Sequence, residues 1–441
     1  MSILKGLDIN ERGHLEFSGF NLKDLSEKYS TPLFIYDSDI LRENYRTFFQ
    51  AFRKRYDKTI VAYSIKTNYN IALCKIVQEE GAYAEVASGL DMYVAERAGF
   101  EPDHIIFDGP YKTKKDLYDA IEKRIFIINV ESFSELEKID RIAGELGVKQ
   151  TVGLRINFSE PGIFNIYEAT HCYPSKRFGF SKEEVIRVIE KALKMKNIDL
   201  AGVMTHPYHK GIDYLLPLVE DISRRLGVHF KYINFGGGFS AGTTWSITTR
   251  DLIKYDIRKK LGFKAKLTKE NYRSNVESIA ESLSEAVMKL QGDISEPTII
   301  FEPGSYLVSD IGILLLRVDH VKQIGDYKWI ITDGGTNLIP HFMEQHELSV
   351  INQHENSSES EEVNIAGPLL YDNDVIAIRR NLPKIYEGDI LAVHDCGAYT
   401  LSKSTQFLQP RPAVLIVNSG NVVKIRERET YEYITKMDRI I

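Results

Sequence analysis

Short apolar runs alternate with longer amphipathic segments along the first two thirds of the chain. The runs are rich in β-branched and aromatic residues, which is typical of buried strands, and the segments between them repeat apolar residues at helical spacing. Strands that alternate with helices in this way predict a parallel sheet. The expected strands are TIVAYSIK, AYAEVAS, HIIFDG, RIFIINV, TVGLRINF, LAGVMTHP, KYINFGGG and PTIIFEPG.

The number of these units indicates the kind of sheet. About eight strand–helix units over roughly 260 residues fit an α/β fold of the closed (β/α)8 barrel type, a TIM barrel, better than an open sheet. Helices can also cover an open doubly wound sheet, so periodicity alone leaves that alternative open. We expect the barrel to span residues 38–302.

The pattern changes after Glu302. Helical periods become rare and strands dominate, from YLVSDIGILLLRVDHVKQI to NVVKIRERE. This predicts a separate, mostly antiparallel β domain, a β-barrel or sandwich, formed by residues 1–37 with 303–441. The acidic stretch 352–362 predicts an exposed loop, and the polar stretch 241–270 looks like an insertion between barrel elements.

Composition narrows the partners and the compartment. The 441 residues carry 62 acids against 56 bases, a net charge of −6, which disfavours a nucleic-acid surface. Cys74, Cys172 and Cys396 lie far apart, which disfavours a disulfide framework or a cysteine metal site and fits a reducing compartment. No apolar stretch approaches the length of a membrane span, and the first residues are too polar for a signal peptide. We expect a cytoplasmic protein with no metal, no nucleic acid and no membrane partner.

Unusual residues fall at the carboxyl ends of the expected strands, where parallel barrels place their functional groups. Lys66 could react with an aldehyde, and the run Gly236–Gly238 could let the backbone approach an anion. Glu302 could pair with a cationic ring nitrogen, and His206 could stack on a ring or act as an acid or base. Each alone has a plainer reading: a solvated rim lysine, a flexible turn, a loop acid, a rim histidine. Together they are what a phosphate-bearing aldehyde cofactor requires.

Several segments along the chain resemble those of one family with this chemistry. In chain order they are TPLFIYD, AYSIKTNYN, AEVASGLDMYVAERAGF, IIFDGPYKT, LRIN, SKRFGF, INFGGG, FEPGSYLV, GPLLYDND and DCGAYTLS. With them the sequence resembles the fold-type III decarboxylases that depend on pyridoxal 5'-phosphate, the group of the diaminopimelate and ornithine decarboxylases. It is closer to the diaminopimelate branch. The resemblance implies a (β/α)8 barrel plus a β domain, and a homodimer with active sites at the interface.

The resemblance also implies roles for single residues. Lys66 matches the lysine that forms an aldimine with the cofactor, and His206 matches the histidine stacked on the cofactor ring. Glu302 matches the carboxylate that keeps the ring nitrogen protonated. The other positions implied to bind the cofactor are Glu85, Ser88, Gly236, Gly237, Gly238 and Tyr399.

One departure from the family concerns the loop expected to come from a neighbouring subunit. The family has a cysteine there that helps control protonation of the substrate Cα, and Leu370 occupies its position. Leucine cannot donate a proton. Tyr371 and Asp372 are the candidates to replace it, unless nothing does.

Other departures concern anion binding. Ser305 replaces an arginine that binds a phosphate or carboxylate in the family, and Pro340 and His341 lie near where the diaminopimelate branch has a second arginine. The usual H-I-G-S segment reads HPYH at 206–209. A buried carboxylate without a cation is costly, so the distal end of the substrate is expected to differ from that of diaminopimelate.

We therefore expect decarboxylation of an amino acid in a biosynthetic pathway, with pyridoxal phosphate bound through Lys66. The substrate classes in view are an unusual amino acid, a conjugated one and a carrier-tethered one. Epimerisation or another reaction at Cα is an alternative that keeps the cofactor. A catalytically silent homologue is the alternative from a different class.

Overall fold

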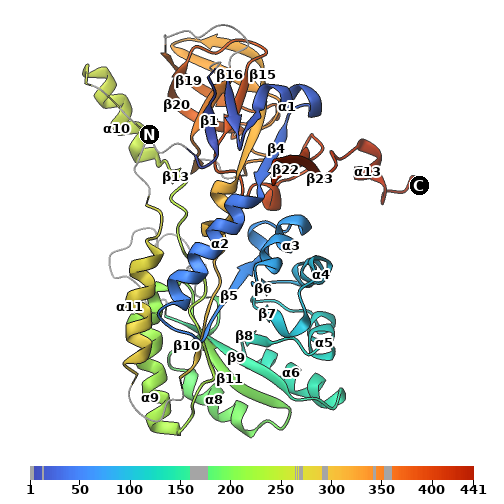
Figure 1. Ribbon diagram of the computed structural model, residues 1–441, viewed down its shortest axis with the longest axis vertical. Coiled ribbons are helices and arrows are strands. Elements are labelled where there is room, and N and C mark those ends of the chain that lie inside the picture. The colour runs from blue at the N-terminus through green and yellow to red at the C-terminus, as the bar shows by residue number, and fades with distance from the viewer. Residues whose placement is uncertain are drawn as a thin grey trace. The chain divides into compact units, whose positions relative to one another are not determined.

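The chain is described from a computed structural model, drawn in Figure 1. The structure describes residues 4–11, 14–158, 177–263, 265, 267, 272–290, 296–340, 344–351 and 360–441. The chain forms two compact units. The barrel unit consists of Tyr45–Phe239 and Asn275–Gly304, and the β unit of Met1–Asn44, Ser240–Ser274 and Ser305–Ile441. The stretch 241–270 therefore belongs to the β unit. The domain limits at residues 38 and 302 stay a prediction.

Eight parallel strands close the barrel. They are β5 (Thr59–Ser64), β6 (Tyr83–Val86), β7 (Ile105–Phe107), β8 (Ile127–Val130), β9 (Gln150–Asn157), β11 (Ile198–Met204), β12 (Tyr232–Asn234) and β14 (Thr298–Phe301). Each pairs with its neighbours, and β14 pairs back to β5 with Ile299 opposite Thr59. The short strand β10 (Phe180–Ser181) adds to β9. The predicted barrel is confirmed, because an open sheet would leave β5 and β14 unpaired with each other.

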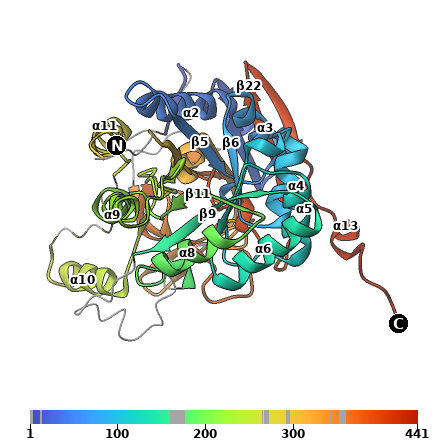
Figure 2. The same cartoon turned by 90° about the horizontal axis from the view of Figure 1, so that it is seen from below.

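Amphipathic helices surround these strands, as Figure 2 shows. They are α3 (Ile71–Glu79), α4 (Gly89–Ala98), α5 (Lys114–Glu122), α6 (Phe133–Glu145), α8 (Val185–Lys194), α9 (Leu216–Leu226) and α11 (Val276–Met288). A π-helical turn, η4 (Gly211–Leu215), leads into α9. Inside the barrel, Ala62, Ile106, Ile127 and Ile300 form a buried apolar cluster. The interior is thus a packed core, which leaves the strand ends for function.

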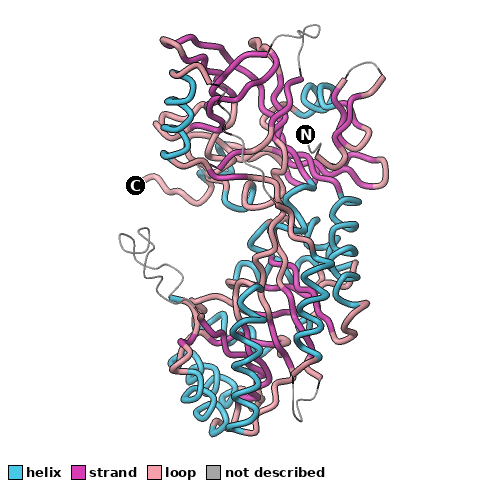
Figure 3. Tube along the Cα trace, turned by 90° about the vertical axis from the view of Figure 1, so that its left-hand side faces the viewer, coloured by secondary structure: helices cyan, strands magenta, loops and turns pink. Residues whose placement is uncertain are grey.

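The β unit is built on one large sheet, whose strands are magenta in Figure 3. Most pairs are antiparallel, while β16 with β19 and β4 with β22 are parallel, so the prediction of a mostly antiparallel β domain is confirmed. The strands are β4 (Leu33–Asp37), β15 (Gly312–Ile324), β16 (Tyr327–Thr332), β18 (Leu348–Ile351), β19 (Ser360–Ala366), β20 (Val375–Pro383), β21 (Ile390–Val393), β22 (Ala413–Asn418) and β23 (Asn421–Arg426).

Smaller elements complete this unit. Three short strands form a meander: β1 (Leu7–Ile9), β2 (Leu15–Phe17) and β3 (Phe20–Asn21). Another pair joins β13 (Trp245–Ser246) to β17 (Glu344–Gln345). The helices are α1 (Leu22–Tyr29), α10 (Thr249–Lys260), α12 (Ser305–Val308) and α13 (Tyr431–Thr435). Helix α2 (Ser38–Arg53) runs from the β unit into the barrel unit.

The strand expected over 306–324 begins later than predicted. Its first residues form α12 and the 3-10 turn η5 (Ser309–Ile311). The cause is a buried carboxylate: Asp310 accepts hydrogen bonds from Arg273 Nη1 at 2.8 Å and Asn44 Nδ2 at 2.7 Å. The Arg273 guanidinium also lies 4.2 Å from the centre of the Tyr306 ring. These contacts outweigh the local strand pattern.

The acidic stretch 352–362 is also only partly as expected. Residues 360–362 begin strand β19, where Glu361 pairs with Lys328 at 2.5 Å and lies opposite Leu382. Residues 352–359 lie outside the described residues, so the loop expected there stays a prediction.

The described part of the chain adds two findings on partners and thiols. It contains no helix that is both long and apolar enough to cross a membrane. Cys74 and Cys396 are buried free thiols, and Cys172 lies outside the described residues.

Candidate active site at the carboxyl end of the barrel

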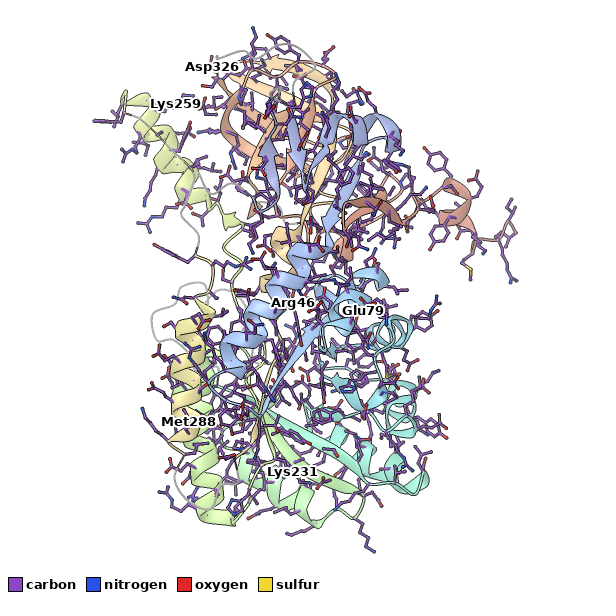
Figure 4. All side chains as sticks on the ribbon, viewed as in Figure 1. Arg46, Glu79, Lys231, Lys259, Met288 and Asp326 are labelled. Carbon is purple, nitrogen blue, oxygen red and sulfur yellow. The ribbon has the colours of Figure 1, made fainter. Side chains whose placement is uncertain are left out.

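The ends of the barrel strands surround one cavity of about 450 Å³. Charged or titratable side chains from six of the eight strand ends line it, namely Lys66, Glu85, Asp108, Arg155, His206 and Glu302. The opposite end of the barrel is different in kind. There Lys231, labelled in Figure 4, forms an exposed ion pair with Asp199 at 3.0 Å. Buried charge is therefore concentrated where parallel barrels hold their active sites.

Lys66 lies in the short turn η1 (Ile65–Thr67) that follows β5. Its amine forms an ion pair with Glu85 at 2.5 Å, and Glu85 also accepts a hydrogen bond from Ser64 Oγ at 2.5 Å. Burial alone raises the pKa of Glu85, but the charge of Lys66 and these hydrogen bonds bring it below its usual value. Glu85 is thus a carboxylate that holds the lysine amine at the cavity.

His206 follows β11 and also faces the cavity. Burial, together with the charges of Arg155 and Lys66, lowers its pKa to about 4. The imidazole is therefore neutral at pH 7. A neutral, flat ring at this position is suited to stacking against a planar ligand.

The run Gly236–Gly238 follows β12 as a wall of bare backbone. A Cβ atom on Gly236 would lie 2.5 Å from the Thr205 carbonyl oxygen, and one on Gly237 would lie 2.6 Å from the Glu302 carbonyl oxygen. Gly236 and Gly238 also have φ angles of 64° and 92°, which favour glycine. The structure needs glycine here, and backbone without side chains is the kind of surface that can approach an anion closely.

Glu302 follows β14 and is 5 % exposed. Asn234 Nδ2 donates to its carboxylate at 2.5 Å, while Asn234 Oδ1 accepts from the amide of Gly236 at 2.8 Å. Burial, with the charges of Asp108 and Glu85, raises the pKa of Glu302 well above its usual value. A cationic ring nitrogen would relieve this, because it would give the carboxylate an opposite charge.

Asp108 and Arg155 were not named as site residues from the sequence. Asp108 is 4 % exposed and accepts a hydrogen bond from Asn129 Nδ2 at 2.5 Å. Burial and the charge of Glu85 raise its pKa to about 6. Arg155 forms an ion pair with Glu131 at 2.7 Å. Both residues lie at strand ends, so the rule that singled out Lys66 and Glu302 could have found them.

Ser88 has a structural use in the barrel unit. It is the N-cap of α4, and its side chain accepts a hydrogen bond from the amide of Asp91 at 3.2 Å. Such caps stabilise a helix by about 1 kcal/mol. Its expected contact with a cofactor stays a prediction.

The remaining predicted residues lie in the β unit. Leu370 is 93 % exposed, and Tyr371 and Asp372 next to it are also exposed. Their loop is fixed by Asp374, which accepts hydrogen bonds from the amides of Leu369 at 2.8 Å and Thr336 at 2.7 Å. Tyr399 follows β21 with φ of 54°, and the Lys403 amine lies 4.7 Å from the centre of its ring. The predicted roles of these residues stay predictions.

The cavity fits pyridoxal phosphate on three counts. The bare backbone at Gly236–Gly238 suits a phosphate. The Lys66 amine suits an aldehyde, and the buried Glu302 suits a protonated ring nitrogen. These groups suit three chemically different ends of one cofactor. Lys66 and Glu302 line the cavity, and the glycine run packs against His206 and Glu302 beside it.

Comparison with known proteins gives the family. The profile of the family "Pyridoxal-dependent decarboxylase, pyridoxal binding domain" matches residues 42–309. Diaminopimelate decarboxylase of Aquifex aeolicus is 31% identical over 435 residues, which cover 96% of this chain and 95% of that protein. The Bacillus subtilis enzyme of the same name is 33% identical over 451 residues, covering 97% and 96%.

Solved structures agree with these sequence matches. The crystal structure of diaminopimelate decarboxylase from M. jannaschii in complex with L-lysine is similar with a TM-score of 0.84 and 28% identity. The match covers 99% of this chain and 98% of that one. A lysine/ornithine decarboxylase of Vibrio vulnificus shares the fold, with a TM-score of 0.72 and 21% identity. The chain therefore belongs to the pyridoxal-dependent decarboxylases, in the diaminopimelate decarboxylase branch, and is a pyridoxal phosphate-dependent carboxy-lyase that acts on an amino acid.

Proposed function

We propose that this decarboxylase binds its cofactor covalently through Lys66 and removes the α-carboxylate of its substrate in the barrel cavity. The observation that carries the proposal is that the Lys66 amine and the buried Glu302 line a single cavity. The Gly236–Gly238 run packs directly against His206 and Glu302 at its edge. Pyridoxal phosphate, when bound, supplies an electron sink for the electron pair that is left at Cα when CO2 departs.

Each residue of the chain has a task in this reaction. Glu302 holds a proton at the ring nitrogen through a charge-assisted hydrogen bond, and Asn234 fixes the orientation of Glu302. His206 covers one face of the ring and excludes water from it. Glu85 holds the Lys66 amine in place at the cavity through their 2.5 Å contact.

Protonation of Cα after the loss of CO2 falls to Lys66 in this proposal. Lys66 lines the cavity, and its pair with the Glu85 carboxylate favours the ammonium form, which has a proton to give. Leu370 has no proton to give, and Tyr371 and Asp372 are the residues beside it with a hydroxyl or carboxyl group. A rate that depends on Tyr371→Phe or Asp372→Asn would transfer this task to the loop.

The substrate we propose is an amino acid whose distal end differs from that of diaminopimelate, including conjugated or carrier-tethered amino acids. Ser305, a neutral side chain where the family has an arginine, supports this. Diaminopimelate itself is the second candidate. The names of the relatives favour it, and Arg177 and Lys210 line the cavity as cations for a distal carboxylate.

Measurement of CO2 release decides between these substrates. We expect turnover of meso-diaminopimelate to be at least tenfold slower, as kcat/KM, than turnover of the best amino acid from a panel of lysine-length and conjugated compounds. Equal or faster turnover of meso-diaminopimelate would establish it as the substrate, and the assignment as a decarboxylase would stand unchanged.

The cofactor site has its own test. We expect purified protein with pyridoxal phosphate to show a visible to near-ultraviolet absorption band that borohydride removes, and mass mapping to place the reduced cofactor on Lys66. Lys66→Ala should lose the band and the activity while keeping the fold, because the Lys66 side chain is 46% exposed and adds little packing. Lys231→Ala, at the other end of the barrel, is the matched control. Full turnover by Lys66→Ala would overturn the mechanism.

We also propose that the chain acts as a homodimer in the cytoplasm. The exposed Leu370 on a loop anchored by Asp374 supports a contact with a second copy, and the free thiols of Cys74 and Cys396 support a reducing compartment. Sedimentation should give twice the mass of the chain. Leu370→Asp should shift the protein toward monomers, and a dimer of unchanged stability in that variant would refute the role of this loop.

A further inference from the structure

Two of the buried carboxylates at this end of the barrel are neutralised by a cation. Glu85 pairs with Lys66 at 2.5 Å, and Glu131 pairs with Arg155 at 2.7 Å. Glu131 also accepts a hydrogen bond from the amide of Gly179 at 2.6 Å. Each cation thus already has its own carboxylate at contact distance.

Two further carboxylates, Asp108 and Glu302, line the active-site cavity and have an asparagine amide as partner in place of a cation. Asp108 accepts a 2.5 Å hydrogen bond from Asn129, and Glu302 accepts one of the same length from Asn234. Asp108 is 4% exposed and Glu302 is 5% exposed. An amide satisfies one lone pair but carries no charge, so it offsets little of the cost of burying a carboxylate.

Asp108 and Glu302 have the same arrangement at two different places in the barrel: each follows one strand and accepts a hydrogen bond from an asparagine of the neighbouring strand. Asp108 follows β7 and its asparagine lies in the neighbouring strand β8, while Glu302 follows β14 and its asparagine lies in the neighbouring strand β12. Both face one cavity because the barrel is closed. Two carboxylates in one low-dielectric cavity repel each other, which favours a state with a single shared proton.

We propose that Asp108 is a positioning residue that acts through Glu302: in the ligand-free pocket the two carboxyl groups hold one proton, and the negative charge of Asp108 keeps that proton on Glu302. The proposal rests on the function proposed above for what it means in catalysis. There, Glu302 can pass its proton from the carboxyl oxygen to a basic ring nitrogen and remain behind as the carboxylate that stabilises the new N–H bond. Asp108 then adds a second negative charge to the surroundings of that cation.

The proton affinities of the two groups agree with this arrangement. The pKa of Glu302 lies well above its usual value, and after burial the charge of Asp108 is the largest cause. The pKa of Asp108 is raised to about 6, so Asp108 is mostly ionised at pH 7. The other charged or titratable side chains that line the cavity are Lys66, Glu85, Arg155, Arg177, His206 and Lys210. Near Asp108, Lys112 Nζ donates to the carbonyl oxygen of Gly109 at 2.8 Å and to Glu135 at 3.1 Å.

Infrared spectroscopy of the ligand-free protein tests the shared proton without use of activity. At pH 7.5 we expect the absorption of a buried protonated carboxyl group, and we expect Glu302→Gln to remove it. Asp108→Asn should lower the proton affinity of Glu302 at least tenfold, which moves the titration of this absorption down by about one pH unit. Asp108→Glu keeps the charge and should restore the wild-type midpoint. Asp319→Asn, a change at an exposed carboxylate, is the matched control.

The outcomes separate this proposal from the proposed function. An unchanged midpoint in Asp108→Asn, or no protonated carboxyl in the wild-type protein, overturns the proton sharing even if pyridoxal phosphate binds to Lys66. A shifted midpoint in a protein that fails to bind pyridoxal phosphate would support the pair and refute the cofactor assignment. If Asp108→Asn does not fold, Asn129→Leu supplies the second variant: without its hydrogen bond Asp108 holds a proton more tightly, and the Glu302 midpoint should again fall.

Discussion

Gly237 shows how closely the glycine run is packed against Glu302 and His206. A Cβ atom there would lie 2.6 Å from the carbonyl oxygen of Glu302, a main-chain atom that cannot swing away. The same substitution would therefore disturb two parts of the site, the wall and the end of β14. The geometry of the site therefore requires that residue 237 has no side chain.

We predict that Gly237→Ala destabilises the protein by about 1–3 kcal/mol and weakens binding of pyridoxal phosphate at least tenfold, because the backbone must shift to admit the methyl group. Urea unfolding and titration with the cofactor measure the two effects. Gly147→Ala is the control for cofactor affinity alone, since a Cβ there would meet open space, while its φ of 65° strains an alanine and lowers stability by itself. Gly147→Ala should leave cofactor affinity unchanged, and wild-type affinity in Gly237→Ala would contradict the prediction.

At this scale the sequence was informative where the residue type is unusual for its position. A lysine, a glycine run and an acid at strand ends stand out. The geometry brings Lys66 and Glu302 to one cavity and packs Gly237 against Glu302. Asp108 did not stand out, because Asp-Gly after a strand is also an ordinary turn. Its importance comes from burial and from Asn129, a neighbour 21 positions away, neither of which a sequence pattern displays.

Lys112 connects three elements of the barrel unit through hydrogen bonds of its side chain. Its side chain is fully buried, and its amine donates to the carbonyl oxygens of Gly109 and Asn129 at 2.8 and 2.9 Å and to Glu135 at 3.1 Å. It thereby ties the loop after β7 to β8 and to the first turn of α6. This loop carries Gly109, which lines the cavity.

We predict that Lys112→Met lowers the free energy of unfolding by about 3–5 kcal/mol, because it leaves the Glu135 carboxylate buried without its cation. Urea unfolding measures the loss. The double variant Lys112→Met with Glu135→Leu should recover part of it. Lys115→Met, at an exposed lysine, should change stability by less than about 0.5 kcal/mol. A loss of that small size in Lys112→Met would refute the role of the buried pair.

The elements themselves were predicted best where periodicity was strong. Buried strands followed by amphipathic helices gave the barrel, and the helix α8 has its buried residues Val185, Val188, Ile189 and Ala192 on one stripe, as the spacing indicates. The helical start at Ser305–Ile311 was missed. Its apolar, β-branched sequence resembles a strand, and only the contacts of Arg273 and Asp310 decide otherwise.

For the whole molecule, buried histidines set a limit on stability in acid. His394 is 7% exposed, and its Nε2 lies 2.8 Å from Ser349 Oγ. Burial, then the charges of His346 and Arg380, lower its pKa to about 4. The unfolded chain binds a proton at this residue near pH 6.5, whereas the folded protein does not. The stability that depends on the neutral His394 is therefore fully present above pH 6.5, and the free energy of unfolding decreases as the pH falls from 6.5 toward 4.

We predict that the free energy of unfolding decreases between pH 6.5 and pH 4 by about 3 kcal/mol less in His394→Gln than in the wild-type protein. Carboxyl groups with a raised pKa, such as Asp108, act in the opposite direction, so the comparison between the two proteins is what isolates His394. Urea unfolding at several pH values measures it. His14→Gln changes an exposed histidine and should keep the wild-type slope. Parallel curves for wild type and His394→Gln would contradict the prediction.

The closed strand order has a consequence for the time at which the protein becomes functional in the cell. Strand β5 is made early, but its partner β14 ends at Phe301, and the β unit's strand β4 waits for β22, which ends at Asn418. A nascent chain still on the ribosome therefore holds Lys66 long before Glu302 is made. The barrel cannot close until β14 emerges, so cofactor capture follows the synthesis of Phe301, and a chain truncated before it would be released with open sheet edges for chaperones to shield.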